Sequence, residues 1–478
     1  MMIISVIIFV VNKKTKIIAT VGPASKSTEV IEKMIENGVD IFRFNLKHND
    51  FDWHKKIVLR VRKVAKRLKK PIGIMVDFQG PEIRLETKNG LPVEIKNGEV
   101  FWISDKLTDN TKVIKVDPAV VVKYIKKDEK IFIDNGNYDL KVLGRMGNKI
   151  KVISDDDLVI KNRKSLNVIS DDLDLPMLAE RDKEALARLA EINPDYIALS
   201  FVRSKKDIEV LKKLLLKIDP EVKVVAKIEN ARAIRNIEEI TEKADVIMVA
   251  RGDLGIEIPL EELAFWQKKI INLCRTKSKP VIVATQMLLS MVENNKPTRA
   301  EVTDVSNAVF DGTDALMLSE ETSIGINPPR VIKEMREIAE FCEKSGTNCK
   351  LNIKPQTSTE VLVDAAVKII EKNKDLKIGA VIIFTQTGTT ARIFSKYRVN
   401  LPVIAVTDSK DTIKGLLISY GVKSFLQKFE KTCFRTPMPL IDKLISKGFV
   451  SKGDNVLIMH GGNWMETGAT TDISLVTV

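Results

Sequence analysis

The sequence predicts an α/β fold built on a TIM (β/α)8 barrel, with a small β-barrel-like lid domain inserted into the barrel and an α/β domain at the C-terminal end. Eight short runs rich in Ile and Val alternate with amphipathic stretches. Each run is continuously apolar, as in a parallel strand that is buried on both faces. Eight such βα units favour a closed barrel over an open doubly wound sheet. The length of 478 residues corresponds to roughly three domains.

The barrel strands are predicted from these runs. In chain order they are 16–22, 39–45, 71–77, 195–202, 222–229, 244–251, 280–286 and 314–320. Most of them are followed by a helical pattern of apolar residues, for example at 204–218.

An insertion interrupts the barrel pattern after the third run. About 120 residues precede the fourth run, whereas one βα unit takes roughly 30. Within this gap, residues 85–170 alternate between polar and apolar, and Asn-Gly or Gly-Asn pairs stand at 89–90, 97–98, 136–137 and 147–148. This pattern is typical of β-hairpins. Because the insertion leaves from the C-terminal end of a strand, we expect it to lie over the barrel mouth as a lid.

A third unit begins after a polar stretch that ends near residue 359. It starts with a helix at 359–372, and α/β patterning continues to the C-terminus. The expected division is a first barrel part at 1–84 with an N-terminal extension at 1–12, the lid at 85–170, a second barrel part at 171–345 and a C-terminal α/β regulatory domain at 355–478.

Composition narrows the classes of protein. The apolar run at 1–11 is shorter than the roughly 17–25 residues of a membrane span and lacks the features of a signal peptide, so we expect a soluble protein with no membrane partner. Four scattered cysteines without a CxxC pair fit a reducing cytoplasm. The net charge of +13 predicts anionic partners. With 5% aromatic residues and no RNP-like run, small phosphorylated substrates are favoured over nucleic acid.

Charged side chains stand where the predicted strands end, and these ends form the active site of a TIM barrel. Glu229 and Asp253 are 24 residues apart, about one βα unit, and two carboxylates with room for water suit Mg²⁺. Lys227 lies two residues from Glu229 and on the same face of the strand, where its ammonium suits a transferring phosphoryl group. Ordinary ion pairing within the barrel is the alternative interpretation.

Other strand-end residues are candidates for anion binding. Arg43 and Arg84 can form bidentate contacts with phosphate, although a single arginine often pairs with a surface carboxylate instead. Gly252 precedes a short helix expected to start near Asp253, and backbone amides there can bind a carboxylate.

Several motifs resemble the pyruvate kinase family over nearly the whole chain. They are KIIATVGPAS (16–25), FRFNLKH (42–48), DFQGPEIR (77–84), VAKIEN (225–230), MVARGDLGIEIP (248–259) and the long run at 279–322 that ends in DALMLSEET. The resemblance implies the same domain order. It also implies a glycolytic enzyme that transfers the phosphoryl group of phosphoenolpyruvate to ADP, giving pyruvate and ATP.

The resemblance also implies roles for individual residues. Glu229 and Asp253 resemble the Mg²⁺ ligands, Lys227 the lysine that neutralises the phosphoryl group, and Thr285 the threonine of the proton step. The remaining positions are Arg43 and Arg84 at the phosphates, Gly252 and Asp253 at the substrate carboxylate, Pro23, Asn45, His48 and Lys164 at the nucleotide, and Asn45, Asp77 and the carbonyl of Phe78 at a monovalent cation.

Some positions depart from the family pattern. The serine after RxN is Lys47, the threonine after the aspartate of DxxGPE is Phe78, the glycine of SGET is Glu320, and the hinge motif LPG is Val168-Ile169-Ser170. Lys47 removes a hydroxyl ligand and brings an ammonium to the place of potassium, so we predict activity that is largely independent of potassium. Lys47 could instead pair with Glu82 or face solvent, and Glu82 occupies the position where potassium-independent relatives carry lysine.

The C-terminal unit carries a candidate effector site. The loop FTQTGTT (384–390) passes from a strand into a helix, and Thr385, Thr387, Gly388, Thr389 and Thr390 could hold a phosphate. In the family this loop binds sugar-phosphate effectors, whereas an ordinary turn with Thr capping is the other interpretation. The resemblance further implies a homotetramer.

Two other functions remain open from the sequence. One is another Mg²⁺-dependent TIM-barrel enzyme of phosphoenolpyruvate or pyruvate, of the aldolase or carboxylase type. The other is a basic nucleic-acid-binding protein without catalysis, which only the charge of +13 supports.

Overall fold

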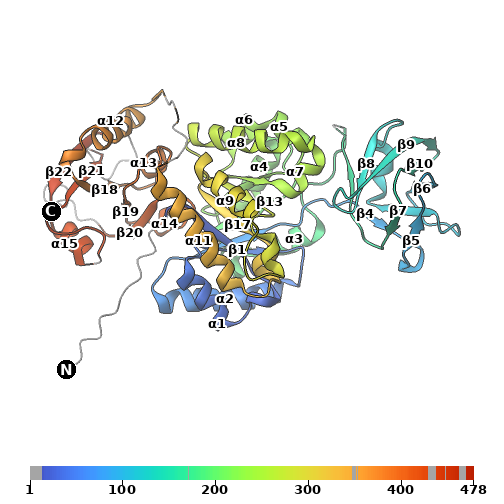
Figure 1. Cartoon of the computed structure of the whole chain (residues 1–478), viewed down its shortest axis with the longest axis horizontal. Helices are drawn as coiled ribbons and strands as arrows, with labels where there is room; N and C mark the ends of the chain where they lie inside the picture. Colours follow the sequence, from blue (N-terminus) through green and yellow to red (C-terminus); the bar gives the residue numbers. More distant parts are fainter. Residues whose placement is uncertain are drawn as a thin grey trace.

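The computed structural model describes residues 13–170, 172–346, 351, 354–428, 438–446, 448–461 and 470–478. Three bodies follow one another along the molecule: the C-terminal α/β unit, the barrel and the β-rich lid (Figure 1). The extension predicted at 1–12 lies outside the described residues, as do Cys349 and Cys433. Cys274 and Cys342 are buried free thiols.

Eight parallel strands close into the predicted barrel in the order β1-β17-β16-β15-β14-β13-β3-β2. They are β1 (Lys16–Thr20), β2 (Ile41–Asn45), β3 (Gly73–Asp77), β13 (Tyr196–Leu199), β14 (Lys223–Ile228), β15 (Val246–Ala250), β16 (Val281–Ala284) and β17 (Ala315–Leu318). Each strand lies within one predicted run and is shorter than it, because buried turns continue the apolar pattern. Val39, for example, is buried but donates its N–H to Met34 O in a turn.

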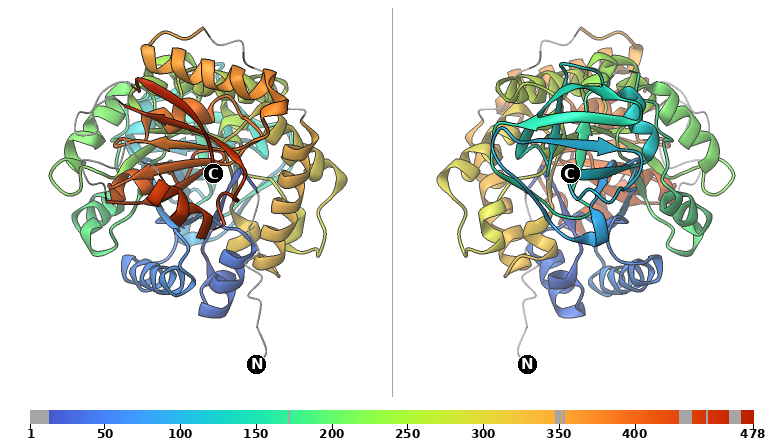
Figure 2. Two further views of the ribbon diagram at one scale, coloured as in Figure 1. Left: turned by 90° about the vertical axis from the view of Figure 1, so that its left-hand side faces the viewer. Right: turned by 90° about the vertical axis from the view of Figure 1, so that its right-hand side faces the viewer.

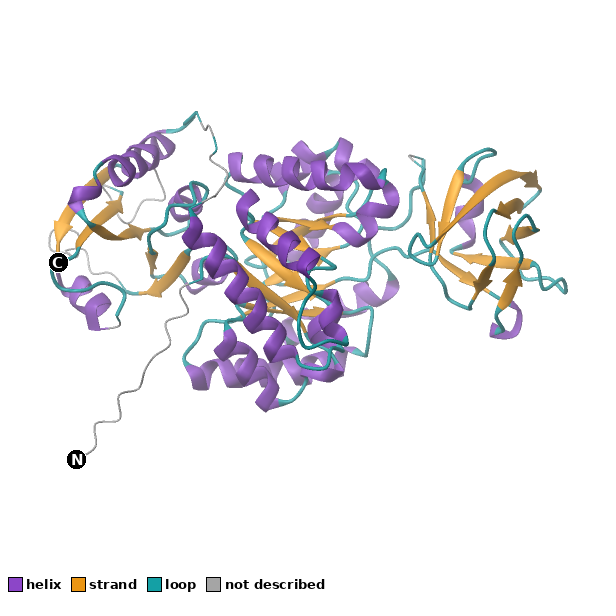
Figure 3. Cartoon of the chain, viewed as in Figure 1, coloured by secondary structure: helices purple, strands orange, loops and turns teal. Residues whose placement is uncertain are grey.

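Helices surround the barrel on its outside (Figure 3). They are α1 (Thr28–Asn37), α2 (Phe51–Leu68), α3 (Glu180–Ala187), α4 (Lys205–Leu215), α5 (Ala231–Arg235), α6 (Ile237–Lys243), α7 (Arg251–Glu257), α8 (Leu263–Thr276), α9 (Arg299–Asp311), α10 (Glu320–Ser323) and α11 (Pro328–Ser345). Local signals set their ends. Ser27 caps α1 by accepting a hydrogen bond from Val30 N, and Gly38, with φ of 114°, ends that helix.

The lid consists of two antiparallel-rich sheets that are seen in front of the barrel in the right view of Figure 2. A seven-stranded sheet has the order β12-β8-β9-β10-β6-β7-β4, and β11 pairs with β5. The strands are β4 (Arg84–Glu86), β5 (Val93–Ile95), β6 (Val100–Ser104), β7 (Val113–Asp117), β8 (Lys130–Ile133), β9 (Tyr138–Met146), β10 (Lys149–Ser154), β11 (Leu158–Ile160) and β12 (Leu166–Val168).

Two of the four predicted turns join antiparallel neighbours. Residues 136–137 and 147–148 connect the paired strands β8 to β9 and β9 to β10. The hairpin expected at 97–98 is wrong, because β5 pairs with β11 and not with β6. Residues 89–90 lie in a 3₁₀ turn (Lys88–Gly90) and in the link to β5. The Asn-Gly and Gly-Asn pairs thus predict where the chain turns, but they do not predict which strands pair.

The C-terminal unit has a five-stranded sheet in the order β20-β19-β18-β21-β22, which lies in front of the barrel in the left view of Figure 2. Its elements are α12 (Ser358–Lys372), β18 (Ile378–Phe384), α13 (Thr389–Ser395), β19 (Val403–Thr407), α14 (Lys410–Leu416), β20 (Val422–Leu426), α15 (Met438–Ser446), β21 (Asn455–His460) and β22 (Asp472–Thr477). Only β22 runs antiparallel to its neighbour, so the predicted α/β character is confirmed.

Buried polar contacts attach this unit to the N-terminal ends of the barrel strands, opposite the lid. The guanidinium of Arg398 pairs with Asp314 (Nη2 to Oδ2 2.8 Å). Lys16, the first residue of β1, donates from Nζ to Val422 O over 2.9 Å. The C-terminal ends of the strands therefore remain open toward the lid. Within the described residues, no helix is long and apolar enough to cross a membrane.

Candidate active site

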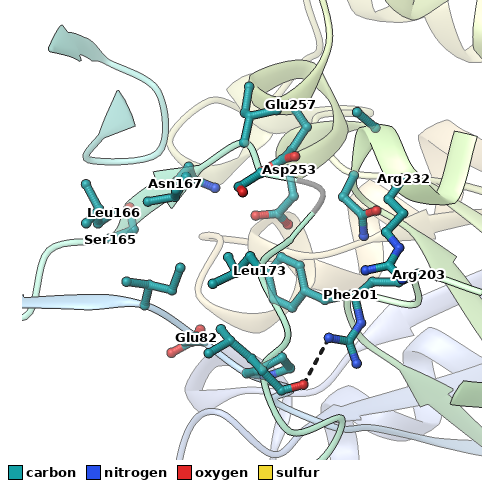
Figure 4. Close-up of a pocket in the computed structure, with 18 of the residues that line it drawn as sticks. Glu82, Ser165, Leu166, Asn167, Leu173, Phe201, Arg203, Arg232, Asp253 and Glu257 are labelled. Atoms are coloured by element: carbon teal, nitrogen blue, oxygen red, sulfur yellow. Dashed lines mark hydrogen bonds between the residues drawn. The ribbon is translucent and has the colours of Figure 1, made fainter. Parts of the chain in front are cut away.

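The C-terminal ends of the barrel strands open into a cleft of about 140 Å³ between the barrel and the lid. Figure 4 shows Asp253 and Glu257 of α7 on the barrel side, and Ser165, Leu166 and Asn167 on the lid side. The insertion therefore covers the barrel mouth, as the sequence predicts.

Lys227, at the end of β14, is held by three oxygen atoms at the base of the barrel mouth. Its Nζ lies 2.8 Å from Glu229 Oε1 and 3.4 Å from Asp77 Oδ1, and it donates to Ser200 Oγ over 2.7 Å. Burial lowers the pKa of Lys227, but the carboxylates of Asp77 and Glu229 outweigh this and raise it above its usual value. The site thus holds a permanent ammonium charge.

The predicted pair of carboxylates lies just beyond the ends of neighbouring strands: β14 pairs with β15, Glu229 follows β14, and Asp253 lies in α7 after β15. Glu229 is 1% exposed and accepts a hydrogen bond from Phe201 N (2.7 Å). Burial, together with the charge of Asp253, raises the pKa of Glu229 to about 7 against the opposing charge of Lys227. A cation held by both carboxylates would relieve this repulsion. Two hard carboxylates, with Asp253 in the lining of the cleft, match Mg²⁺, which needs only one or two protein carboxylates.

Thr285 and Gly252 meet beside this pair. Gly252 N donates to Thr285 Oγ1 over 2.9 Å, and Arg251 Nη2 donates to Thr285 O over 2.6 Å. Thr285 and Gln286 both have positive φ, of 72° and 53°. Such backbone strain in residues with a Cβ is characteristic of functional sites. Helix α7 starts at Arg251, two residues before the predicted start near Asp253, so the Gly252 amide belongs to its first turn.

The residues predicted to hold a monovalent cation also come together. Asn45 and Asp77 face each other across β2 and β3. Asp77 Oδ2 lies 2.6 Å from Arg43 Nε, and the charges of Lys227 and Arg43 hold the pKa of Asp77 below its usual range although burial opposes them. The carbonyl of Phe78 accepts a hydrogen bond from Ser200 Oγ (2.7 Å).

Lys47 pairs with Glu82, one of the interpretations that the sequence leaves open. Lys47 Nζ lies 2.7 Å from Glu82 Oε1, and Arg84 Nη2 lies 2.8 Å from the same oxygen. Both cations lower the pKa of Glu82 although burial raises it. Lys47, Glu82 and Arg84 line the cleft.

The residues predicted to bind the nucleotide are spread more widely. Pro23, in a 3₁₀ turn (Pro23–Ser25) after β1, and His48 after β2 are exposed. Lys164 lies in the lid, where it forms an ion pair with Asp134. It is absent from the described lining of the cleft, whereas its neighbour Ser165 is part of it.

Sequence reasoning missed Ser200 and Phe201, which follow β13. The Ser200 hydroxyl connects Lys227 to the Phe78 carbonyl, and Phe201, with φ of 53°, directs its amide to Glu229. A hydroxyl after a predicted strand is a common feature, so only the expectation that all strand ends converge could have found them.

The loop of the candidate effector site lies in the C-terminal unit, remote from Lys227. Thr385 Oγ1 accepts from Gly388 N (2.9 Å) and Thr390 hydrogen-bonds to Thr470, so these two hydroxyls are used within the fold. Thr387 and Thr389 line a second cleft of about 930 Å³ between this unit and the barrel.

Comparisons with known proteins agree with this arrangement. The family model described as "Pyruvate kinase, barrel domain" matches residues 12–332, and that described as "Pyruvate kinase, alpha/beta domain" matches residues 360–477. The chain belongs to the pyruvate kinase family. A pyruvate kinase from Thermotoga maritima is 36% identical over 456 residues, which cover 94% of this chain and 96% of the relative. A pyruvate kinase from Staphylococcus aureus (strain MRSA252) is 37% identical over 463 residues, which cover 96% of this chain and 79% of the relative.

A solved structure extends the likeness to the whole pyruvate kinase fold. The crystal structure of a pyruvate kinase from Cryptosporidium parvum superposes with a TM-score of 0.89 at 31% identity and covers 98% of this chain and 96% of that one. The barrel, the lid and the C-terminal unit therefore have the arrangement of a pyruvate kinase.

Proposed function

We propose that this chain transfers the phosphoryl group of phosphoenolpyruvate to ADP, giving pyruvate and ATP. The observation that carries the proposal is the buried ammonium of Lys227, held between Asp77, Glu229 and Ser200 beneath the lid. The enolate is a good leaving group, so the protein mainly has to align the nucleotide and neutralise charge. Family membership argues against an aldolase, a carboxylase or a nucleic-acid-binding protein.

Glu229 and Asp253 would hold Mg²⁺. A bound Mg²⁺ would neutralise charge on the phosphoryl and carboxylate oxygens of the substrate. Lys227 would also contact the transferring phosphoryl group, and Arg43 and Arg84 would flank the phosphates. The amides of Gly252 and Asp253 would receive the substrate carboxylate.

The remaining roles follow from the family. Thr285 would hold the proton of the enolate step at its Oγ1, which lies beside Gly252 N in this structure. Pro23, Asn45, His48 and Lys164 would contact the nucleotide, and Lys164 would have to exchange its ion pair with Asp134 for a phosphate. The lid would exclude water from the cleft during transfer.

The experiment is a steady-state assay with phosphoenolpyruvate, Mg²⁺ and ADP, in which pyruvate and ATP are measured separately. Equal amounts of both products, with none when ADP is omitted, support the proposal. Pyruvate formation or carboxylation without ADP would contradict it.

For the monovalent cation we propose that Lys47 replaces potassium. Lys47, Glu82 and Arg84 together carry a charge of +1, because Lys47 and Arg84 share one carboxylate. A serine at position 47 together with one captured potassium ion would give the same balance. The lysine therefore supplies permanently the charge that an ion would bring.

Initial rates with tetramethylammonium as the only monovalent cation test this proposal. We expect added potassium to change the rate of the unmodified enzyme less than twofold and to activate Lys47→Ser strongly. Lys55→Ser is the matched control, because Lys55 also forms a 2.7 Å ion pair, with Glu191, outside the lining of the cleft. Strong activation of the unmodified enzyme by potassium would refute the proposal.

In the C-terminal unit we propose a phosphate site for an effector at Thr387, Gly388 and Thr389, with Thr385 and Thr390 holding the loop in shape. Arg392 supports it: its guanidinium donates to Thr387 O and Thr389 Oγ1 (both 3.2 Å), and its partial burial lowers its pKa. Titration with sugar phosphates and AMP, followed by activity and thermal unfolding, tests the site against the variant Thr389→Val.

We also propose a cytoplasmic homotetramer. Large apolar side chains are exposed on the barrel, among them Leu260 (70%), Phe265 (59%) and Phe341 (74%), and such surfaces favour association. Light scattering coupled to size exclusion measures the state directly, and a monomeric mass at micromolar concentration would contradict it.

A further inference from the structure

Asp182, in the first turn of α3, holds together the two chain segments that connect the barrel with the lid. Its carboxylate is fully buried and accepts three backbone hydrogen bonds. Gln79 N donates to Oδ1 over 2.7 Å, and Gly80 N and Ala179 N donate to Oδ2 over 2.9 and 3.0 Å. Gln79 and Gly80 lie on the segment that leaves the barrel after β3, and Ala179 lies on the segment that returns.

The contacts of the Asp182 carboxylate are hydrogen bonds from backbone amides rather than ion pairs. Among the ion pairs of the described residues none involves Asp182, so backbone amides alone satisfy its charge. Burial raises its pKa, and the charge of Asp77 adds to this effect, while the three amides oppose it. The three amides are therefore held in place by the carboxylate, because a buried oxygen or N–H group without a hydrogen-bond partner destabilises the fold.

The segment that Asp182 holds is packed directly against the site. Gly80 has φ of 71°, and a Cβ at this position would lie 2.8 Å from the Cβ of Ser200. Ser200 in turn donates to Phe78 O and accepts from Lys227, as described above. A shift of the Gln79–Gly80 peptide therefore moves the partners of Lys227.

The same segment also leads into the lid. Glu82, which pairs with Lys47 and Arg84, follows Gly80 by two residues, and β4 begins at Arg84. The pivot of the lid and the position of the Arg84 guanidinium thus depend on where Asp182 holds the chain.

We propose that Asp182 is a positioning residue that fixes both connections of the lid to the barrel, so that the lid closes about one defined pivot while Lys227 keeps its partners. Asp182 contacts neither substrate nor reacting atoms. The kinetic part of this proposal rests on the proposed function, whereas its structural part does not.

The test compares Asp182→Asn with Asp195→Asn in the full-length enzyme. Asparagine keeps the shape but replaces one accepting oxygen with an amide group, so at least one of the three N–H groups loses its partner. Asp195 is a matched control, because it is also a buried aspartate whose pKa burial raises. It lies directly before β13, and it accepts from Ile74 N over 2.7 Å at the end of β3 opposite to Gln79 and Gly80.

We expect Asp182→Asn to lower kcat about tenfold and to raise the KM for ADP about threefold, since small misplacements of positioned groups are costly. Hydrogen exchange of the peptide that covers residues 78–84 should become about tenfold faster. Asp195→Asn should leave kcat, KM and this exchange rate within about twofold. If Asp182→Asn does not fold, Gly80→Ala should give the same kinetic changes, because it displaces the same segment.

Unchanged kinetics in Asp182→Asn, or equal changes in Asp195→Asn, would overturn the proposal. Unchanged exchange at residues 78–84 would also overturn it, whatever the activity. If the unmodified enzyme lacks phosphoryl transfer but exchange still responds only to Asp182→Asn, the structural role stands and the proposed function fails.

Discussion

Replacing Lys227 by methionine removes the charge that the proposed reaction needs most. Methionine fills a similar volume but cannot donate to Glu229, Asp77 or Ser200, which lie 2.7–3.4 Å from the ammonium. Preorganised contacts of this kind act mainly on the transition state, so kcat should fall much more than KM rises. We expect a loss of roughly 10²–10³ in kcat, equivalent to about 3–4 kcal/mol.

A second effect of this variant reaches the proposed Mg²⁺ site. Lys227 opposes the rise of the Glu229 pKa, which nevertheless stands at about 7. Without Lys227 this pKa moves further up, so protons compete more strongly with Mg²⁺ for Glu229 and the concentration of Mg²⁺ needed for half-activation increases. Raising the pH or the Mg²⁺ concentration should recover this part of the loss and leave the lower kcat.

The assay is a steady-state measurement of kcat, KM and half-activating Mg²⁺ between pH 7 and 9. Two variants control it. Lys227→Arg keeps the charge but not the shape and should retain part of the activity. Lys16→Met removes another buried lysine at the opposite end of a barrel strand and should leave kcat unchanged.

Thermal unfolding must accompany these rates, because Lys227→Met leaves the buried carboxylate of Glu229 without its ion-pair partner, a change that typically costs about 3–5 kcal/mol, while Asp77 keeps Arg43. A folded Lys227→Met variant with near-normal kcat at saturating Mg²⁺ would refute the reasoning. So would an equal loss of kcat in Lys16→Met.

Three further outcomes are expected. Asp253→Asn should raise the half-activating Mg²⁺ concentration at least tenfold, with partial recovery in excess Mg²⁺; an unchanged concentration would contradict its role as a ligand. Burial lowers the pKa of Lys16 to about 8 from 10.5, so its charge weakens the folded state below pH 8 and this loss disappears as the pH rises to 10.5. The stability difference between Lys16→Met and the unmodified enzyme should therefore shift by about 3 kcal/mol across this range in urea unfolding, and a constant difference would argue against it. Arg398→Met should destabilise the enzyme by about 3–5 kcal/mol in the same measurement, because it leaves Asp314 buried without its partner; a loss below 1 kcal/mol would show that the pair matters little.

The barrel could be predicted from the sequence because its strands are buried on both faces. Such strands read as continuous apolar runs, and all eight predicted runs contain a strand. The pairing of β5 with β11 could not be predicted, since it depends on side-chain packing between segments more than 60 residues apart. Turn residues show only that the chain reverses.

The candidate site divides in a similar way. Lys227 and Glu229 were predictable as a pair, because alternate residues of a strand share a face. The bond between Lys47 and Glu82 was one of several open possibilities, since it joins two loops whose geometry follows from the fold. Asp182 gave no signal, because an aspartate three residues after a helix cap is usually a local capping residue.

The backbone conformation of some site residues was the feature that the sequence did not reveal. Phe201, Thr285 and Gln286 have positive φ although each carries a Cβ, and sequence patterns do not mark such residues. All three directly follow barrel strands, where Phe201 N reaches Glu229 and Thr285 Oγ1 receives Gly252 N. Strained residues persist only where their surroundings determine them, and here the packed strands on either side supply that constraint. The apolar runs that predict the barrel therefore also supply the rigidity that keeps Glu229 and Thr285 in place.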